Sequence, residues 1–187
     1  MSNAKHSNRK HKGWTTLSSK TVYENNWIRV NHEEVITPGG TEGIYGVVHM
    51  KSHAVGIIPI DNDGNTWLVK QTRYTIKQSS WEIPEGGSPE GKDILETAKR
   101  ELEEECGLKA ASWEKLIEIH TSNSVTDEAG TIFVAKELSP GWQQLEATED
   151  IEVRKLPLQD AVQMVLDGEI TDSLSVAGLL RVSLLQL

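Results

Sequence analysis

Residues 54–60 restrict the fold of this 187-residue chain more than any other stretch. They form a continuous apolar run, AVGIIPI, without the polar residue at every second position that a strand with one solvent-facing side would carry. Such a run is typical of a central strand that is buried on both faces. A strong turn signal follows at residues 61–65, and residues 66–71 resume strand character. We therefore expect a sheet whose centre is enclosed.

The clearest helix is expected at residues 93–106. Asp93 and Glu96 have the spacing of an N-terminal capping box. Apolar residues recur every four positions along this segment and form a stripe on one helix face. Gly107 stands where a C-terminal cap belongs. The start, the buried face and the end of this helix can thus all be predicted.

Strands and two more helices account for most of the remaining chain. Strands are expected from residue 27 to the turn at 38–40, and at residues 44–50, 113–121, 131–138 and 151–156, with helices at 158–167 and from 171 onward. Strands interleaved with few helices indicate an α+β or mixed α/β layered domain.

Charge divides the chain into a short basic head and an acidic body. Four cations fall within the first twelve residues, although the whole chain has a net charge of −9. An acidic body argues against nucleic-acid binding. No stretch has the length of a membrane span or the pattern of a signal peptide. The single cysteine, Cys106, excludes a disulfide within the chain and fits a cytoplasmic location.

Three parts of the chain differ in character. Residues 1–14 are expected to be a disordered basic tail, part of which resembles a cloning remnant; the alternative is an anchor for an acidic partner. Residues 15–50 form an expected β-strand unit, and residues 51–187 the main domain.

Glu101, Glu104 and Glu105 share one face of the predicted helix. Their i, i+3 and i+4 spacing places the Cβ atoms about 5–6 Å apart, where like charges repel by a few tenths of a kcal/mol per pair. Such a cluster is either a solvated acidic face or a binding site for a hard cation such as Mg²⁺, which prefers carboxylate oxygens. Composition alone favours the solvated face.

The residues around these glutamates resemble a known motif. Gly86, five residues, Lys92, seven residues and then Arg100-Glu101-Leu102-Glu103-Glu104-Glu105-Cys106-Gly107-Leu108 resemble the Nudix box, G-x5-E-x7-R-E-U-x-E-E-x-G-U, where U is aliphatic. Eight of the nine specified positions match. The chain is thereby identified as a member of the Nudix hydrolase superfamily.

This resemblance implies an α+β fold, a mixed sheet layered between helices as an α/β/α sandwich, with a small N-terminal antiparallel β unit. It also implies a pyrophosphatase that uses Mg²⁺, for which Mn²⁺ could substitute. The implied metal ligands are Glu101 and Glu105, joined by Glu104 and by the backbone carbonyl of Glu85. Gly86, Arg100 and Gly107 take structural roles in the motif.

Lys92 is the one departure from the motif. Members of the family usually carry a glutamate there, which pairs with the arginine that corresponds to Arg100. Lysine cannot make that pair, so either Glu96 or Asp93 is expected to replace it. We expect a change in the scaffold rather than a loss of catalysis, because the metal-binding glutamates are intact.

Segments outside the box resemble the ADP-ribose and nucleoside-diphosphate-sugar hydrolase branch of the superfamily. They include residues 43–48, 69–74, 81–86 and 168–173. By this resemblance the guanidinium of Arg73 contacts the substrate diphosphate, while Trp27 and Tyr45 stack on the nucleobase. Each of these has a plainer alternative, as a surface charge or as a structural aromatic. The branch also implies a homodimer that forms through the N-terminal strands.

The water-activating base is expected in the acidic loop at residues 145–150. Glu149 is the first choice and Glu146 the second, with Glu104 also in the predicted catalytic set. Relatives often carry a glutamate where this chain has Ala147. Either loop glutamate could instead be a solvated charge.

The function expected from all these features is hydrolysis of the pyrophosphate bond in ADP-ribose or a nucleotide sugar, giving a nucleoside monophosphate and a sugar phosphate. The expected partner is therefore a small nucleoside diphosphate sugar, with neither nucleic acid nor membrane. Two alternatives remain at this point: a catalytically silent sensor of nucleotide sugars with the Nudix fold, and a Nudix enzyme for another nucleotide.

Overall fold

A computed structural model describes residues 9–11, 13–145 and 150–186 of the chain. The chain forms two compact units. The first, which we call the β unit, consists of Met1–Ser52 and Ser122–Glu128; the second, the α/β unit, consists of His53–Thr121 and Ala129–Leu187. The Nudix motif and its helix lie entirely within the α/β unit.

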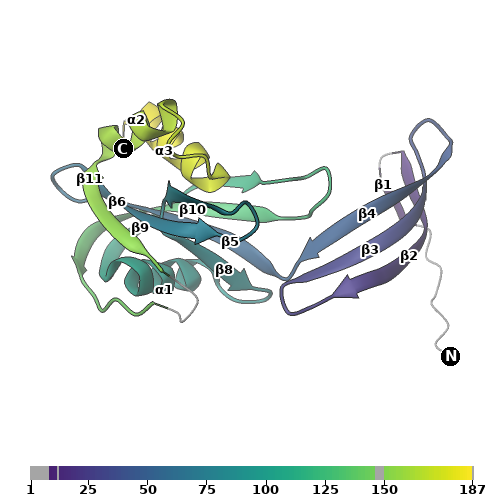
Figure 1. The fold of residues 1–187 in the computed structure, drawn as a ribbon, viewed down its shortest axis with the longest axis horizontal. Coiled ribbons are helices and arrows are strands. Elements are labelled where there is room, and N and C mark those ends of the chain that lie inside the picture. Colours follow the sequence, from purple (N-terminus) through teal and green to yellow (C-terminus); the bar gives the residue numbers. More distant parts are fainter. Residues whose placement is uncertain (1–8, 12, 146–149, 187) are drawn as a thin grey trace. The chain divides into compact units, whose positions relative to one another are not determined.

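The β unit is built on one antiparallel sheet in the order β1-β2-β3-β4 (Figure 1). Its strands are β1 (Arg9–His11), β2 (Trp14–Glu24), β3 (Ile28–Ile36) and β4 (Glu42–Met50). A tight turn joins β3 to β4, in which the Gly40 amide donates to the Thr37 carbonyl over 2.9 Å. Gly40 has a φ of +84°, a conformation that glycine adopts without a steric penalty. The N-terminal antiparallel β unit is therefore present as expected.

The structure differs from expectation at the start of the chain. Strand β1 lies inside the segment 1–14, which we expected to be disordered, and pairs with β2 in the register His11 opposite Trp14. Gly13, with a φ of +96°, allows the tight reversal between the two strands. Residues 1–8 and Lys12 lie outside the described residues.

Two sheets make up the α/β unit. The first has the order β8-β5-β10-β9, from β5 (Ser52–Pro59), β8 (Glu85–Pro89), β9 (Leu108–His120) and β10 (Ala129–Pro140). Strand β10 runs parallel to β5 and antiparallel to β9, so this sheet is mixed. The second is antiparallel and has the order β11-β6-β7, from β6 (Asn65–Arg73), β7 (Gln78–Glu82) and β11 (Glu152–Pro157).

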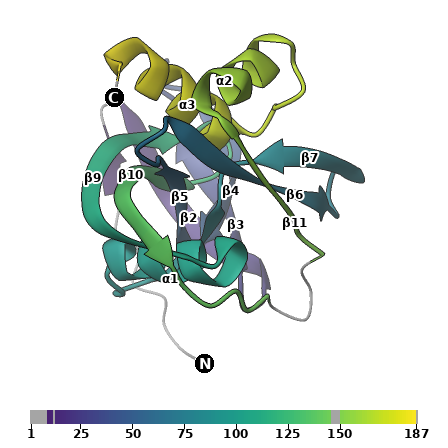
Figure 2. The same ribbon diagram turned by 90° about the vertical axis from the view of Figure 1, so that its left-hand side faces the viewer.

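In the described part of the chain, three helices belong to the α/β unit, and they cover its sheets on two sides (Figure 2). They are α1 (Ile94–Cys106), α2 (Leu158–Leu166) and α3 (Ser173–Leu185). Side chains alternate along β5: Val55 and Ile57 join the cluster that packs on α1, whereas Ile58 belongs to the larger cluster with α2 and α3. Residues 54–60 thus contribute to both apolar layers, which confirms the enclosed central strand and the layered α+β fold.

Strand β8 is not among the strands expected from the sequence. Its sequence, EGGSP, has little intrinsic strand preference. The strand forms because it pairs with β5. Just before it, the Ile57 amide donates to the Pro84 carbonyl over 2.8 Å. The extended backbone at this point is imposed by a distant partner rather than by the local sequence.

None of the helices in the described residues combines the length and the apolar character that crossing a bilayer requires.

The close contact of α3 with the sheet makes core stability testable. Leu179 is fully buried, and Leu179→Ala should lower the free energy of unfolding by about 2–5 kcal/mol, because the substitution leaves a cavity. Leu184 lies on the same helix but is 84% exposed, so Leu184→Ala should change stability by less than about 0.5 kcal/mol. Urea unfolding of both variants tests this, and equal losses would contradict the assigned orientation of α3.

Candidate functional site

Helix α1 holds the three motif glutamates on a backbone that is fixed at both ends. At its start the Asp93 carboxylate accepts a hydrogen bond of 2.8 Å from the Leu95 amide. At its end Gly107 takes the left-handed conformation, with a φ of 64°, and its amide donates to the Glu103 and Leu102 carbonyls. Both caps are where the sequence predicted them, so the helical phase of the glutamates is well defined.

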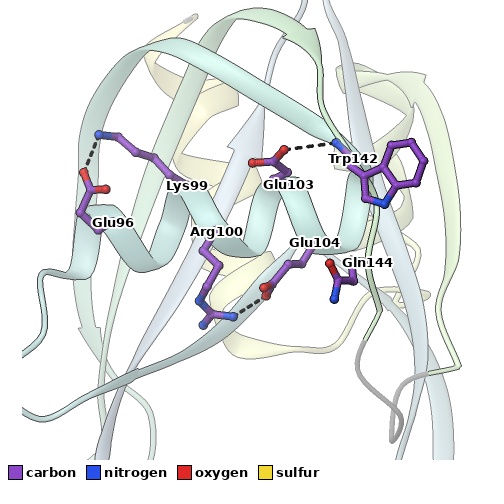
Figure 3. Close-up of a pocket in the computed structure, with 7 residues that line it drawn as sticks. All are labelled: Glu96, Lys99, Arg100, Glu103, Glu104, Trp142 and Gln144. Atoms are coloured by element: carbon purple, nitrogen blue, oxygen red, sulfur yellow. Dashed lines mark hydrogen bonds and ion pairs between the residues drawn. The ribbon is translucent and has the colours of Figure 1, made fainter.

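The three glutamates differ in environment. Glu105 is only 1% exposed and Glu101 is also buried, whereas the Glu104 side chain is partly open to solvent. The guanidinium of Arg100 lies against two of them: Nη1 donates to Glu104 and Nη2 to Glu101. Figure 3 shows Arg100 reaching along the helix toward Glu104. Burial lowers the pKa of Arg100, but the two carboxylates outweigh it and raise that pKa overall.

Arg100 therefore finds its carboxylate partners at positions other than those expected from the sequence. Glu96 accepts a 2.6 Å hydrogen bond from Lys99, and Asp93 caps the helix. Arg100 pairs instead with the motif's own glutamates. A single cation between two carboxylates offsets the repulsion that their spacing creates.

A second arginine holds residues 82–86, the segment from the end of β7 into the start of β8, which faces α1 and which we call the loop. Arg73, at the end of β6, donates from Nε and Nη2 to the buried carboxylate of Glu82, with distances of 3.0 and 2.6 Å to Oε2. Its Nη2 also donates to the carboxylate of Glu85. Ser80 adds a 2.6 Å bond to Glu82. Arg73 thus connects β6 to the segment just before Gly86, while its side chain remains 37% exposed.

Glu85 joins this loop to α1. Its backbone amide donates to Glu105 Oε2 over 3.0 Å. Of its side-chain oxygens, Oε1 accepts from Arg73, whereas Oε2 is buried and has no hydrogen-bond partner among the described residues. Burial and the nearby Asp172 raise the pKa of the Glu85 carboxyl well above its usual range, against the opposing effect of Arg73. The side chain of Glu85 therefore lies in an unusually negative setting.

Gly86 is the point of closest approach between loop and helix. A Cβ atom at this position would overlap the carboxylate of Glu101. A glycine is therefore required here for the glutamate to keep its place, which gives the first residue of the motif a steric reason.

The side chains gathered here suit a hard divalent cation. Within the described part of the chain, the guanidinium groups of Arg73 and Arg100 lie among the carboxylates of Glu82, Glu85, Glu101, Glu104 and Glu105, and Oε2 of Glu85 lacks a hydrogen bond there. Carboxylate oxygens are the ligands that Mg²⁺ and Mn²⁺ prefer. Within the described residues, no three acidic, histidine or thiol groups already converge as a metal-binding set. The Arg100 guanidinium and the Glu85 amide bond these carboxylates instead.

The segment after β10 is tied to the C-terminal end of α1. The Gln144 amide donates to the Glu104 carbonyl over 3.0 Å, and the Gln143 side chain donates to the Glu105 carbonyl over 2.7 Å. With α1 this segment forms an open hollow of about 390 Å³ on the outer helix face, shown in Figure 3. The exposed indole of Trp142 stands at its edge. No sequence pattern predicts this hollow, because it depends on long-range hydrogen bonds to backbone atoms.

The remaining predicted site residues either belong to the β unit or fall outside the described residues. Trp27 belongs to the β unit and is 70% exposed. Tyr45, on β4, is more constrained: its hydroxyl donates to the Ser124 carbonyl over 2.6 Å, and its ring meets Trp14 edge-on at 5.7 Å. Glu146 and Glu149, the expected bases, lie outside the described residues. Glu82 was missed as a site residue, although it lies within a segment that resembles the nucleotide-sugar branch.

Models of two known protein domains match successive parts of the chain. The model of the NUDIX domain matches residues 50–174, and that of the nucleoside diphosphate sugar hydrolase N-terminal domain matches residues 14–48. The chain belongs to the Nudix family and is a Nudix hydrolase.

Individual relatives extend over most of the chain. It is 34% identical to an ADP-ribose pyrophosphatase of Mycobacterium tuberculosis (strain ATCC 25618 / H37Rv), over 89% of this chain and 82% of that protein. It is 31% identical to an ADP-ribose pyrophosphatase of Bacillus subtilis (strain 168), over 84% and 86%. A crystal structure of an ADP compounds hydrolase matches its fold with a TM-score of 0.82 at 22% identity, over 94% and 95% of the two chains.

The contact at Gly86 gives a sharp test of the site. Gly86→Ala should displace the Glu101 carboxylate and weaken Mn²⁺ binding about 10-fold or more. Stability should change little, because Gly86 has no positive φ and the side-chain end it meets can move. Gly46→Ala is the matched control, since a Cβ there meets nothing within 4 Å. Mn²⁺ titration followed by electron paramagnetic resonance measures both, and unchanged affinity in Gly86→Ala would contradict the close approach.

Proposed function

We propose that this Nudix hydrolase cleaves the pyrophosphate of ADP-ribose or a related nucleotide sugar, yielding a nucleoside monophosphate and a sugar phosphate. The observation that carries the proposal is the carboxylate face of α1, held against Gly86 and flanked by two arginines. The similarity to ADP-ribose pyrophosphatases over most of the chain favours this substrate class over other pyrophosphates.

Mg²⁺ is the proposed cofactor, with Mn²⁺ able to replace it. Glu101 and Glu105 would hold it, together with Glu104 and the backbone carbonyl of Glu85. When bound, such an ion neutralises the diphosphate, polarises a phosphoryl group and makes water a better nucleophile. The chain's own part is to fix these donors in place: Gly86 leaves room for Glu101, and the Glu85 amide orients Glu105.

Substrate binding is assigned to three further side chains. Arg73 is held by Glu82 and Glu85 through Nε and Nη2, which orients the rest of its partly exposed guanidinium for a diphosphate oxygen. Trp27, with its exposed indole, is proposed to stack on the nucleobase, and Tyr45 to assist it. Glu149, or else Glu146, is proposed as the base that takes the proton from the attacking water.

The wider organisation is also proposed from family likeness. The strands at residues 15–50 would form the interface of a homodimer, and residues 51–187 would form the hydrolase domain. A cytoplasmic location fits the single cysteine and the small phosphate-ester substrate.

The two alternative functions are less well supported. A silent sensor would have no need to keep Glu101, Glu104 and Glu105 together with the glycine that accommodates them. RNA pyrophosphohydrolases resemble only about a third of the chain; one from Rhizobium meliloti (strain 1021) matches 31% of it.

Loss of a central carboxylate tests the proposed reaction. Glu105→Gln should reduce kcat on ADP-ribose by about 100-fold or more, because an amide is a poor replacement for a carboxylate ligand. Glu103→Gln is the control on the same helix, since Glu103 pairs with Lys109 and the Trp142 amide. Phosphomonoester release from a panel of nucleotide sugars and triphosphates, with Mg²⁺ and a coupled phosphatase, gives the rates. Near wild-type turnover in Glu105→Gln, or a preference for triphosphates, would overturn the proposal.

The stacking role of Trp27 predicts a change in KM. A stacked base contributes about 1–3 kcal/mol, so Trp27→Ala should raise KM roughly 5- to 150-fold while kcat changes less. Trp142→Ala replaces another highly exposed indole and serves as the control. If KM is the same in both variants and in the wild type, Trp27 does not bind the base.

A further inference from the structure

The first turn of α3 reaches into the loop that carries Glu85 and Gly86. Ser175 is fully buried, and its Oγ accepts a 2.9 Å hydrogen bond from the backbone amide of Ile83. The two residues are 92 positions apart in the sequence. This contact places the C-terminal helix directly behind the proposed metal-binding loop.

The Ser175 hydroxyl is itself held in one orientation. Asp172, the N-cap of α3, accepts from both the amide and the hydroxyl of Ser175 at Oδ2, over 2.8 and 2.9 Å. A hydroxyl donates only one hydrogen, so donation to Asp172 leaves its lone pairs for the Ile83 amide. Asp172 therefore does more than cap the helix, because it also sets the direction in which Ser175 accepts.

Three successive residues of the loop are then each fixed by a different element. The Ile83 amide bonds to α3, the Pro84 carbonyl accepts from Ile57 of β5, and the Glu85 amide donates to Glu105 of α1. Asp172 is also close enough to Arg73 and Glu85 to act on both electrostatically. The loop is thus positioned by the sheet, by the carboxylate helix and by the first turn of α3.

We propose that Ser175, oriented by Asp172, is a positioning residue of the active site: through the Ile83 amide it sets the backbone of residues 83–86, and hence the place of the Glu85 carbonyl and of Gly86 against Glu101. This inference rests on the proposed function for its catalytic meaning. It assigns a role to Asp172 and Ser175, which the pyrophosphatase chemistry alone does not explain.

The test measures metal binding without substrate. Ser175→Ala removes the acceptor for Ile83, and the full-length protein should then bind Mn²⁺ at least about 10-fold more weakly by electron paramagnetic resonance, as is typical when groups that orient metal ligands are lost. On the proposed substrate, kcat should fall while KM stays near the wild-type value. Ser173→Ala changes an exposed serine in the same helical turn and should leave both quantities unchanged.

Two conservative variants separate positioning from folding. Ser175→Thr keeps the hydroxyl and should restore Mn²⁺ affinity to within about twofold of the wild type, a small effect on the scale expected for groups that orient ligands. Asp172→Asn keeps a good N-cap and should give an intermediate affinity even if Ser175→Ala does not fold. Wild-type affinity in Asp172→Asn and in any folded Ser175→Ala would overturn the proposal. Absence of hydrolysis by the wild-type protein would instead count against the proposed function. The comparison of Mn²⁺ affinities needs no substrate, so it would still test the positioning role of Ser175.

Discussion

The active-site region depends on two arginines that keep carboxylates close together inside the fold. Arg73 holds Glu82 and Glu85 on the loop, and Arg100 holds Glu101 and Glu104 on α1. Buried carboxylates such as Glu82 and Glu101 are costly unless a positive charge is paired with them. The negative charge that suits these residues to a cation also destabilises the fold through repulsion. The guanidinium groups of Arg73 and Arg100 offset that repulsion.

Close packing of the loop backbone against α1 fixes the positions of these carboxylates. Glu101 occupies the space that a side chain at position 86 would fill, and the Glu85 amide bonds to Glu105. The loop can approach α1 this closely because β5 supports it from one side and Ser175 of α3 from another. Apolar packing on both faces of β5 holds these elements in register, which links the core to the site.

Much of this could be predicted from the sequence, where the signal is local. The apolar run at 54–60 predicted the enclosed strand, and the caps at Asp93 and Gly107 predicted both ends of α1. What depends on long-range contacts could not be predicted in this way. Strand β8 exists through its pairing with β5, and no local pattern marks Ser175 as a partner of Ile83. Arg100 pairs with Glu101 and Glu104, one and four residues further along α1, and not with Glu96 or Asp93 as the sequence suggested.

Binding of Mg²⁺ to the folded protein is the most direct test of the central claim that this carboxylate cluster accepts a divalent cation. A ligand that binds only the folded state stabilises it, by about 2.7 kcal/mol at one hundred times its Kd. We expect the Tm of the wild-type protein to rise saturably with Mg²⁺, relative to a monovalent salt at the same ionic strength, and to return to its starting value with a chelator. A Tm that does not respond to Mg²⁺ would contradict the assignment of Glu101, Glu104 and Glu105 to a metal site.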